Sequence, residues 1–235
     1  MAYSKESLAK VIQLMTEKKK VYASIPLEEI KLCISKGNVK IGRVMNVSLP
    51  PIMTCNHCKE CKHYCYDVKA CLQYPNTVID ARIRNFSVLM KNRDEYFGRI
   101  SWAMSRRKKN KYFRWHVAGD IIDYDYFNRM VENARNHPDF IIWTYTKEYD
   151  IVNEWIKNHG GNKNALPDNF TVMFSEWRGM EMINPYEMPE FRVVMKDDEY
   201  KPSPKYNHYC PGNCDICKKL NRGCIAGETT YCNEH

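Results

Sequence analysis

The cysteines are the residues whose type and spacing point most directly to chemistry. The chain has 11 of them, and all but one fall in two short windows, Cys55 to Cys71 and Cys210 to Cys232. Thiolates two or three residues apart on one loop can bind a single metal centre without long-range folding. The clustering excludes a scattered structural use. In a reducing compartment it favours metal binding or redox chemistry over disulfides.

The first window follows a short apolar run at 44–49 that we expect to be a strand. Zinc and iron–sulfur clusters both accept four thiolates, so every cysteine here is a candidate ligand. His57 and His63 could also bind the metal, but we expect them to be neighbours of the ligands or exposed residues. The candidate ligands of this window are Cys55, Cys58, Cys61, Cys65 and Cys71.

The second window has His208 and His235 nearby. Its dense, uneven spacing differs from the two separated Cys-x-x-Cys pairs of a zinc ribbon and favours an iron–sulfur cluster, with zinc as the alternative. A centre shared between the two windows is a further alternative. Cys33 stands alone in an apolar context, which predicts a small buried hydrophobe. The candidate ligands are Cys210, Cys214, Cys217, Cys224 and Cys232.

Hydrophobic periodicity predicts the elements that must position these groups. After four early helices, strands and helices alternate, which indicates an α/β fold with a mostly parallel sheet or a partial (β/α) barrel. We expect helices at 4–20, 26–35, 79–90, 96–104, 124–136 and 151–159, and further strands at 112–117, 140–146, 170–174 and 191–195.

The apolar periodicity ends near Pro204. We therefore expect an α/β domain at 1–205 that carries the first cysteine window. A cysteine-rich, metal-binding tail at 206–235 would lie beyond the last strand and pack on the same domain.

Polar side chains follow the predicted strands. His116 and Asp120 come after one strand and Lys147 after the next. Carboxyl ends of parallel strands carry ligands and catalytic groups, so we expect these residues to share an edge with the first window. His116 and Asp120 would serve acid–base catalysis or substrate binding, and Lys147 would bind an anion or stabilise developing charge. The alternatives are a hydrogen-bonded core histidine and a solvated helix start.

The formal net charge is +8, with the densest basic runs at 18–20 and 106–109. Such a surplus is compatible with nucleic-acid binding. The alternative is that both runs end helices, where cations complement the helix dipole. We see neither a signal peptide nor an apolar run long enough to span a membrane. The prediction is a cytoplasmic protein with no membrane partner and an unidentified substrate.

Six short motifs, in this order, resemble the phage protein family called gene product 88, and the resemblance runs from about residue 35 to the end. It implies a protein of the host cytoplasm and indicates organisation more than activity. The motifs are residues 35–42, Leu49-Pro50-Pro51, Cys61-x-x-x-Cys65-Tyr66, Arg84-Asn85, residues 116–120 and Tyr145-Thr146-Lys147.

At one remove, the arrangement resembles the radical S-adenosylmethionine (SAM) enzymes, which have a partial barrel and a three-cysteine loop after the first strand. Three thiolates there hold a 4Fe-4S cluster, and the fourth iron chelates SAM. This resemblance implies Cys61, Cys65 and either Cys58 or Cys71 as ligands. It also implies two cofactor-binding residues, Tyr66 beside the cluster and Gly119 against the SAM amino group. We expect Asn38, in the first of the six motifs, to bind the cofactor as well.

That family's Cys-x3-Cys-x2-Cys spacing is absent from the first window and present at Cys210 to Cys217. If the five cysteines of the first window bind all four irons, no site remains for SAM.

The leading hypothesis is an iron–sulfur protein of radical SAM-like α/β fold. One cluster would lie in the first window and a second metal centre in the tail, with reductive or radical chemistry at the carboxyl ends of the strands. The second hypothesis is a non-catalytic, metal-stabilised phage protein that binds nucleic acid or a host protein. The third is an electron-transfer or cluster-storage protein.

Overall fold

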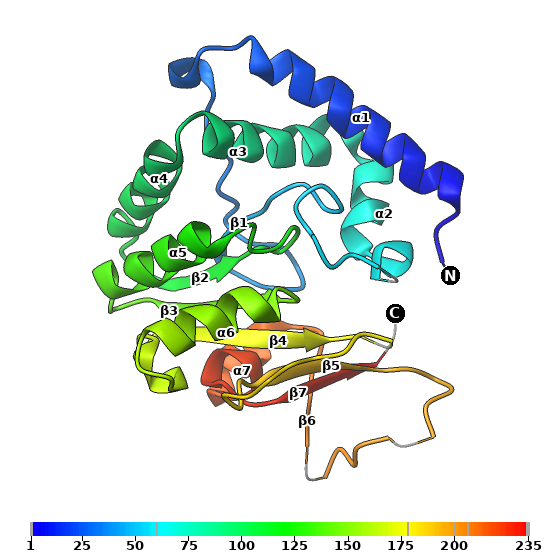
Figure 1. Cartoon of the computed structure of the whole chain (residues 1–235), viewed down its shortest axis with the longest axis vertical. Coiled ribbons are helices and arrows are strands. Elements are labelled where there is room, and N and C mark those ends of the chain that lie inside the picture. The colour runs from blue at the N-terminus through cyan, green and yellow to red at the C-terminus, as the bar shows by residue number, and fades with distance from the viewer. Residues whose placement is uncertain (1, 60, 178, 200, 206, 234–235) are drawn as a thin grey trace.

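The structure is a computed structural model that describes residues 2–59, 61–177, 179–199, 201–205 and 207–233. Within these residues a single seven-stranded sheet has the order β1-β2-β3-β4-β5-β7-β6, and every neighbouring pair is parallel (Figure 1). The predicted α/β class and parallel sheet are confirmed. The strands are β1 (Met45–Val47), β2 (Tyr112–Trp115), β3 (Ile141–Thr146), β4 (Phe170–Glu176), β5 (Glu190–Val194), β6 (His208–Tyr209) and β7 (Thr230–Asn233).

Strands β1 to β5 neighbour one another in chain order, so right-handed crossovers place their connecting helices on one side of the sheet. Figure 1 shows α3, α4, α5 and α6 following one another along the outside of the row of strands. The helices are α1 (Lys5–Ala23), α2 (Tyr66–Gln73), α3 (Asp80–Lys91), α4 (Arg93–Ser105), α5 (Tyr124–Asn136), α6 (Tyr149–Asn158) and α7 (Cys214–Leu220). Short 3-10 turns lie at η1 (Leu27–Glu29), η2 (Cys61–Tyr64), η4 (Lys163–Ala165) and η5 (Gly223–Ala226), and a π-helical turn lies at η3 (Pro75–Ile79).

The two faces of the sheet have different covers. Side chains of one face, such as Trp115, Ile142 and Phe174, belong to a large core with the buried residues of α1 and α3 to α6. On the opposite face Trp143 packs with Ile225 and with residues that precede β1 and lie in α7. Parallel sheets are normally covered on both faces, and here the cysteine-rich tail supplies part of the second cover.

The tail does not lie beyond the last strand, so that expectation was wrong. Strands β6 and β7 belong to it, and β7 lies between β5 and β6. Strands of two and four residues are too short to show an apolar period in the sequence. They form because pairing with a neighbouring strand stabilises them, and not because of a local pattern.

The prediction of a helix at 26–35 was also wrong, because only the η1 turn forms there. The backbone of Cys33 is satisfied by a side chain instead: its N–H donates to Asn85 Oδ1 at 2.7 Å, and Asn85 Nδ2 donates to its carbonyl at 3.0 Å. Cys33 is half-buried and lies in a segment without regular secondary structure.

The basic runs 18–20 and 106–109 do occur at the ends of α1 and α4. Of the helices described, none has the length and apolar character needed to cross a membrane.

Candidate functional site

The loop that follows β1 passes over the carboxyl end of β2. Leu49 N–H donates to the Ala118 carbonyl at 2.9 Å, and Thr54 Oγ1 donates to the Pro50 carbonyl at 2.8 Å. Gly119 has φ +85°, and a Cβ at this position would lie 2.7 Å from Leu49 Cβ and 2.8 Å from Thr54 Oγ1. Glycine is therefore needed for the close approach of the strand end to the loop.

The same loop is attached to the carboxyl end of β3 through Glu148. The buried carboxylate of Glu148 accepts a hydrogen bond from Asn56 N–H at 3.1 Å, and His57 Nδ1 lies 3.1 Å from its other oxygen. Burial raises the pKa of Glu148, and the nearby Asp120 carboxylate adds to the effect. These contacts bring the first cysteine window to the polar strand ends, as predicted.

Four thiols of the first window lie together on this loop. Cys58 is a neighbour of both Cys55 and Cys61, and the interaction with Cys55 is the largest contribution that raises the pKa of Cys58 to about 12. Cys61 also faces Cys65, whose pKa burial raises to about 11. The loop therefore presents a compact group of soft sulfur donors, which we call the loop cysteines: Cys55, Cys58, Cys61 and Cys65.

Lys147 and Asp120 border the loop cysteines. Lys147 Nζ donates to Ser175 Oγ at 3.2 Å. Burial by itself would lower the pKa of Lys147, but the Cys61 sulfur and the Asp120 carboxylate outweigh it and the pKa is raised. Asp120 accepts hydrogen bonds from Thr146 Oγ1 at 2.6 Å and from Lys147 N–H at 3.0 Å. Burial nevertheless raises its pKa. The arrangement places a cation and a carboxyl group next to the thiols.

His116 is directed away from this polar group. It is buried with φ +53°, and its Nε2 lies 2.9 Å from the Tyr126 hydroxyl. Burial lowers the pKa of His116 to about 3, and Arg114 lowers it further, so the ring is neutral. The contacts of His116 are those of a core histidine, and they do not include Asp120.

Three further predicted residues have separate positions. Cys71 is fully buried in the large core, with its Sγ 4.0 Å from Asp67 Oδ2. Among the described cysteines, only Cys65 contributes to the shift in the pKa of Cys71. Tyr66 begins α2 immediately after Cys65. Asn38 Oδ1 accepts from the N–H groups of residues 40 and 41, at 2.9 and 3.0 Å, so this side chain shapes the turn before β1 and does not reach the loop cysteines.

The tail cysteines form a second group, on the sheet face opposite the helices. Cys210 is the common neighbour, since its charge raises the pKa of each of the other four thiols. His208 joins the group with Nε2 at 3.6 Å from Cys217 Sγ. His235 lies outside the described residues. We call this set the tail cysteines: Cys210, Cys214, Cys217, Cys224 and Cys232.

Arg114 is a residue of β2 whose side chain neighbours the tail cysteines, and the sequence pattern did not single it out. Its guanidinium is 4.5 Å from the centre of the Tyr145 ring, and it faces Cys214 and Cys224. The signal that could have identified Arg114 is a charged residue at an inward position of a predicted strand. Glu148 was missed because one carboxylate beside Lys147 has no distinctive spacing.

Within the described part of the chain, no three His, Cys, Asp or Glu side chains are already arranged to hold a metal ion. The sulfurs are neighbours without forming a finished coordination shell.

A family model described as Gene product 88 matches residues 14–216. No curated protein and no solved structure matches the chain.

Proposed function

The chain belongs to the gene product 88 family of phage proteins, and from that premise and the geometry above we propose that it is an iron–sulfur protein with its catalytic cluster on the loop cysteines. The observation that carries the proposal is the meeting of four thiols with Lys147 and Asp120 at the carboxyl edge of a parallel sheet. In parallel α/β folds this edge is where reacting groups meet substrate.

The donor set fits such a group. Soft thiolates select iron–sulfur clusters or zinc over hard cations. A cluster held by thiolates carries negative charge, and the half-buried Lys147 ammonium beside Cys61 would offset it. Because the sulfurs are adjacent but not arranged as a finished ligand shell, we expect binding to reorder the loop while Glu148 keeps it attached to β3.

Cys71 is the least suited of the five predicted ligands of the first window. It is fully buried in the core, and its thiol is directed toward Asp67. The ligands would therefore come from Cys55, Cys58, Cys61 and Cys65, with Cys58 preferred to Cys71 as the partner of Cys61 and Cys65.

When bound, a 4Fe-4S cluster supplies single electrons. The chain's own groups would then bind the substrate: Lys147 would hold an anionic part, and Asp120 would accept or donate a proton at its carboxyl oxygen. Ser175, hydrogen bonded to Lys147, orients the ammonium. These roles make the protein a candidate reductive enzyme.

The finer, radical SAM-like form of the proposal requires one iron without a protein ligand. Four loop cysteines offer one more thiol than that arrangement uses. The variant in which SAM binds is therefore tested separately, by equilibrium binding of SAM and by its reductive cleavage in reconstituted protein. Absence of both would remove SAM and leave the iron–sulfur proposal in place.

We extend the proposal to a second metal centre on the tail cysteines. Five thiols and His208 exceed the four donors that zinc or an iron–sulfur cluster needs, and Arg114 would balance their negative charge. Zinc is the alternative metal for this centre.

Anaerobic purification followed by iron, sulfide and zinc analysis tests both centres. We expect iron and sulfide in the wild type, and a reduced protein with an electron paramagnetic resonance signal of a cluster. C58A should lose iron, while C33A, which removes a thiol outside both groups, should keep it. A colourless protein that contains only zinc would overturn the iron–sulfur proposal.

A further inference from the structure

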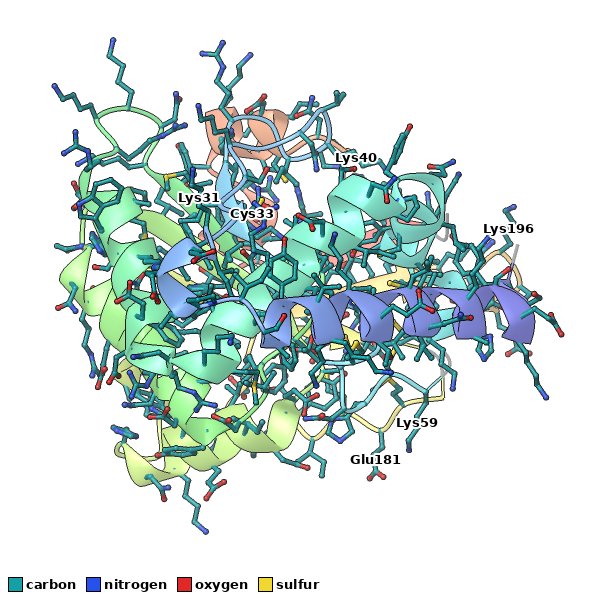
Figure 2. All side chains as sticks on the ribbon, turned by 90° about the horizontal axis from the view of Figure 1, so that it is seen from above. Lys31, Cys33, Lys40, Lys59, Glu181 and Lys196 are labelled. Atoms are coloured by element: carbon teal, nitrogen blue, oxygen red, sulfur yellow. The ribbon has the colours of Figure 1, made fainter. Side chains whose placement is uncertain are left out.

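A basic opening of about 610 Å³ lies at the amino edge of the sheet. Two segments that are far apart in the sequence line it, the turn before β1 and the loop between α4 and β2. In Figure 2, nitrogen-tipped side chains extend from these light-blue and green segments at one edge of the molecule. Six cations line the opening, and we call them the basic set: Lys36, Arg43, Arg106, Arg107, Lys108 and Lys109.

The fold explains why the two segments meet. Strands β1 and β2 are parallel neighbours, with Met45 opposite Phe113, so the segments that enter them lie side by side at the amino edge. The turn that carries Lys36 and Arg43 is held in shape by Asn38, and a Cβ at Gly42 would collide with Asp215 of α7. The opening is thus built on a fixed turn, at the sheet edge opposite the loop cysteines.

The basic set has no acidic partners among the described residues. None of its six cations forms an ion pair, although other arginines of the chain, such as Arg82 and Arg93, pair with carboxylates. Arg107 Nε is also buried without a hydrogen-bond partner. Leaving a buried donor unsatisfied is costly, so this group is suited to an external acceptor such as a phosphate oxygen.

An exposed aromatic ring stands beside the basic set. Trp102, on the last turns of α4, leaves 65% of its surface exposed, and the Arg106 guanidinium lies 5.3 Å from the ring centre. Exposed indoles next to cationic grooves are stacking platforms for unpaired bases, and arginine adds a cation–π contribution.

We propose that this edge binds single-stranded nucleic acid, with phosphates on the basic set and a base stacked on Trp102. The inference goes beyond the iron–sulfur function and does not depend on it, since no cysteine lines the opening. A single strand is favoured over a duplex because only unpaired bases expose a face to an aromatic side chain.

The test is fluorescence anisotropy of a labelled oligothymidylate of about 20 nucleotides, with the full-length protein, at salt concentrations between about 50 and 200 mM. K36A/R43A should weaken binding about tenfold and reduce the slope of log affinity against log salt by about 1.4, the value for two lost phosphate contacts on a single strand. K10A/K20A removes the same charge from exposed positions of α1 and should change affinity less than twofold. Equal weakening by both double variants would overturn the site.

Trp102 variants test the stacking step. W102A should weaken oligothymidylate binding about tenfold, and W102F should restore most of the affinity. Inorganic polyphosphate should compete less well than the oligonucleotide, and a duplex of the same length should bind more weakly. Unchanged affinity of W102A, or equal competition by polyphosphate, would overturn the single-strand assignment and leave a general anion site. Circular dichroism melting of each variant separates lost binding from lost folding.

Discussion

At the scale of single residues, the position of a side chain in the sheet decides its chemistry more than its type does. His116 and Asp120 are four residues apart, yet His116 is directed to Tyr126 in the core and Asp120 to Thr146 and the backbone of Lys147. The sequence placed both near a strand end but could not show which way each one is directed. The His116 backbone has a positive φ, which is uncommon for a residue other than glycine and which the strand pattern did not predict.

The buried neutral His116 predicts a pH dependence of stability. Its pKa in the folded chain is about 3, below the value of 6.5 for an exposed histidine, so the unfolded chain binds the extra proton. The stabilisation is complete above pH 6.5 and is lost as the pH falls toward 3, by about 1.4 kcal/mol per pH unit.

H116N removes this titration while an asparagine tolerates the positive φ. The free energy of unfolding of the wild type minus that of H116N, measured with urea at several pH values, should be constant above neutrality and fall below pH 6.5. A flat difference would show that His116 is accessible to protons in the folded chain.

Gly119 predicts a second effect at this scale. G119A adds the strain of a left-handed backbone, about 1–2 kcal/mol, and a collision with Leu49 and Thr54 that overpacking places at about 1–3 kcal/mol more. G161A is the matched control, because Gly161 has φ +68° and a Cβ there would meet nothing within 4 Å. Urea unfolding should show the larger loss for G119A, and its iron content should be the lower of the two. Equal destabilisation would mean that strain alone acts at Gly119.

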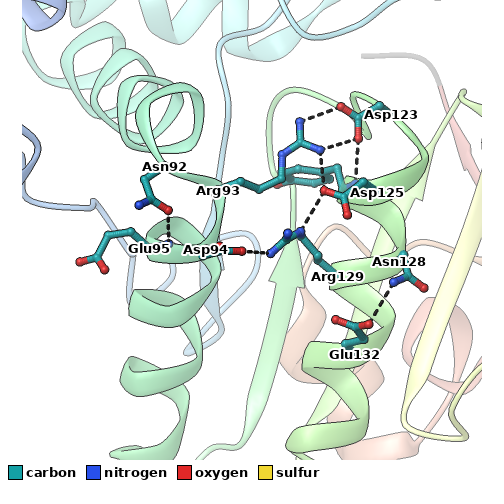
Figure 3. Close-up of polar contacts among 10 residues, drawn as sticks. Asn92, Arg93, Asp94, Glu95, Asp123, Asp125, Asn128, Arg129 and Glu132 are labelled. Atoms are coloured by element: carbon teal, nitrogen blue, oxygen red, sulfur yellow. Dashed lines mark hydrogen bonds and ion pairs between the residues drawn. The ribbon is translucent and has the colours of Figure 1, made fainter.

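At the scale of elements, polar links at the starts of α4 and α5 hold the connection that leads from β2. Asp123 caps α5 by accepting from Tyr126 N–H at 2.8 Å, and both of its carboxylate oxygens receive Arg93 donors, at 2.8 and 2.7 Å (Figure 3). Arg129 is hydrogen bonded both to Asp125 of α5 and to Asp94 of α4, and so also links the two helices. The first turn of α5 carries Tyr126, which contacts His116, so the links stabilise the segment between β2 and α5.

Substitutions at Asp123 separate the cap from the charge. D123A removes both, and we expect it to lower the free energy of unfolding by about 1–2 kcal/mol, the range for a lost N-cap. D123N keeps an oxygen that can accept from Tyr126 N–H and loses only partly exposed ion pairing, so it should cost less than about 1 kcal/mol. Chemical denaturation of the two variants gives the comparison. Equal losses would assign the effect to Arg93 and not to the cap.

At the scale of the whole molecule, the sequence predicted the elements with a strong local pattern. The helix expected at 124–136 coincides with α5, and the four strands expected after residue 110 correspond to β2 to β5. Elements stabilised mainly by tertiary contacts were missed. Strands β6 and β7 depend on pairing, and the segment around Cys33 depends on the Asn85 side chain. The neighbourhood of the loop cysteines was predictable because a parallel sheet gathers its strand ends at one edge. Only residues 106–109 of the basic set were recognised from the sequence, because Lys36 is far from them in the chain.

The tail is part of the sheet and of its cover, so we expect the chain to unfold as one unit. Ile225 of η5 is buried against Trp143, whereas Ile216 of α7 is 44% exposed. I225A should therefore lower the free energy of unfolding by about 2–4 kcal/mol, the range for a large-to-small change in a core. I216A should cost less than about 1 kcal/mol, because nearly half of the truncated side chain is already in water.

The decisive measurement is whether the loss in I225A appears in one transition or two. Far-ultraviolet circular dichroism reports on all helices and strands, and tryptophan fluorescence reports on Trp143 beneath the tail together with the other indoles. If β7 pairing with β5 couples the tail to the sheet, both probes should shift by the same amount in I225A, as expected for two-state unfolding. A separate early fluorescence transition would show that residues 206–235 melt independently. The second metal centre would then fasten a module to the sheet instead of completing its cover.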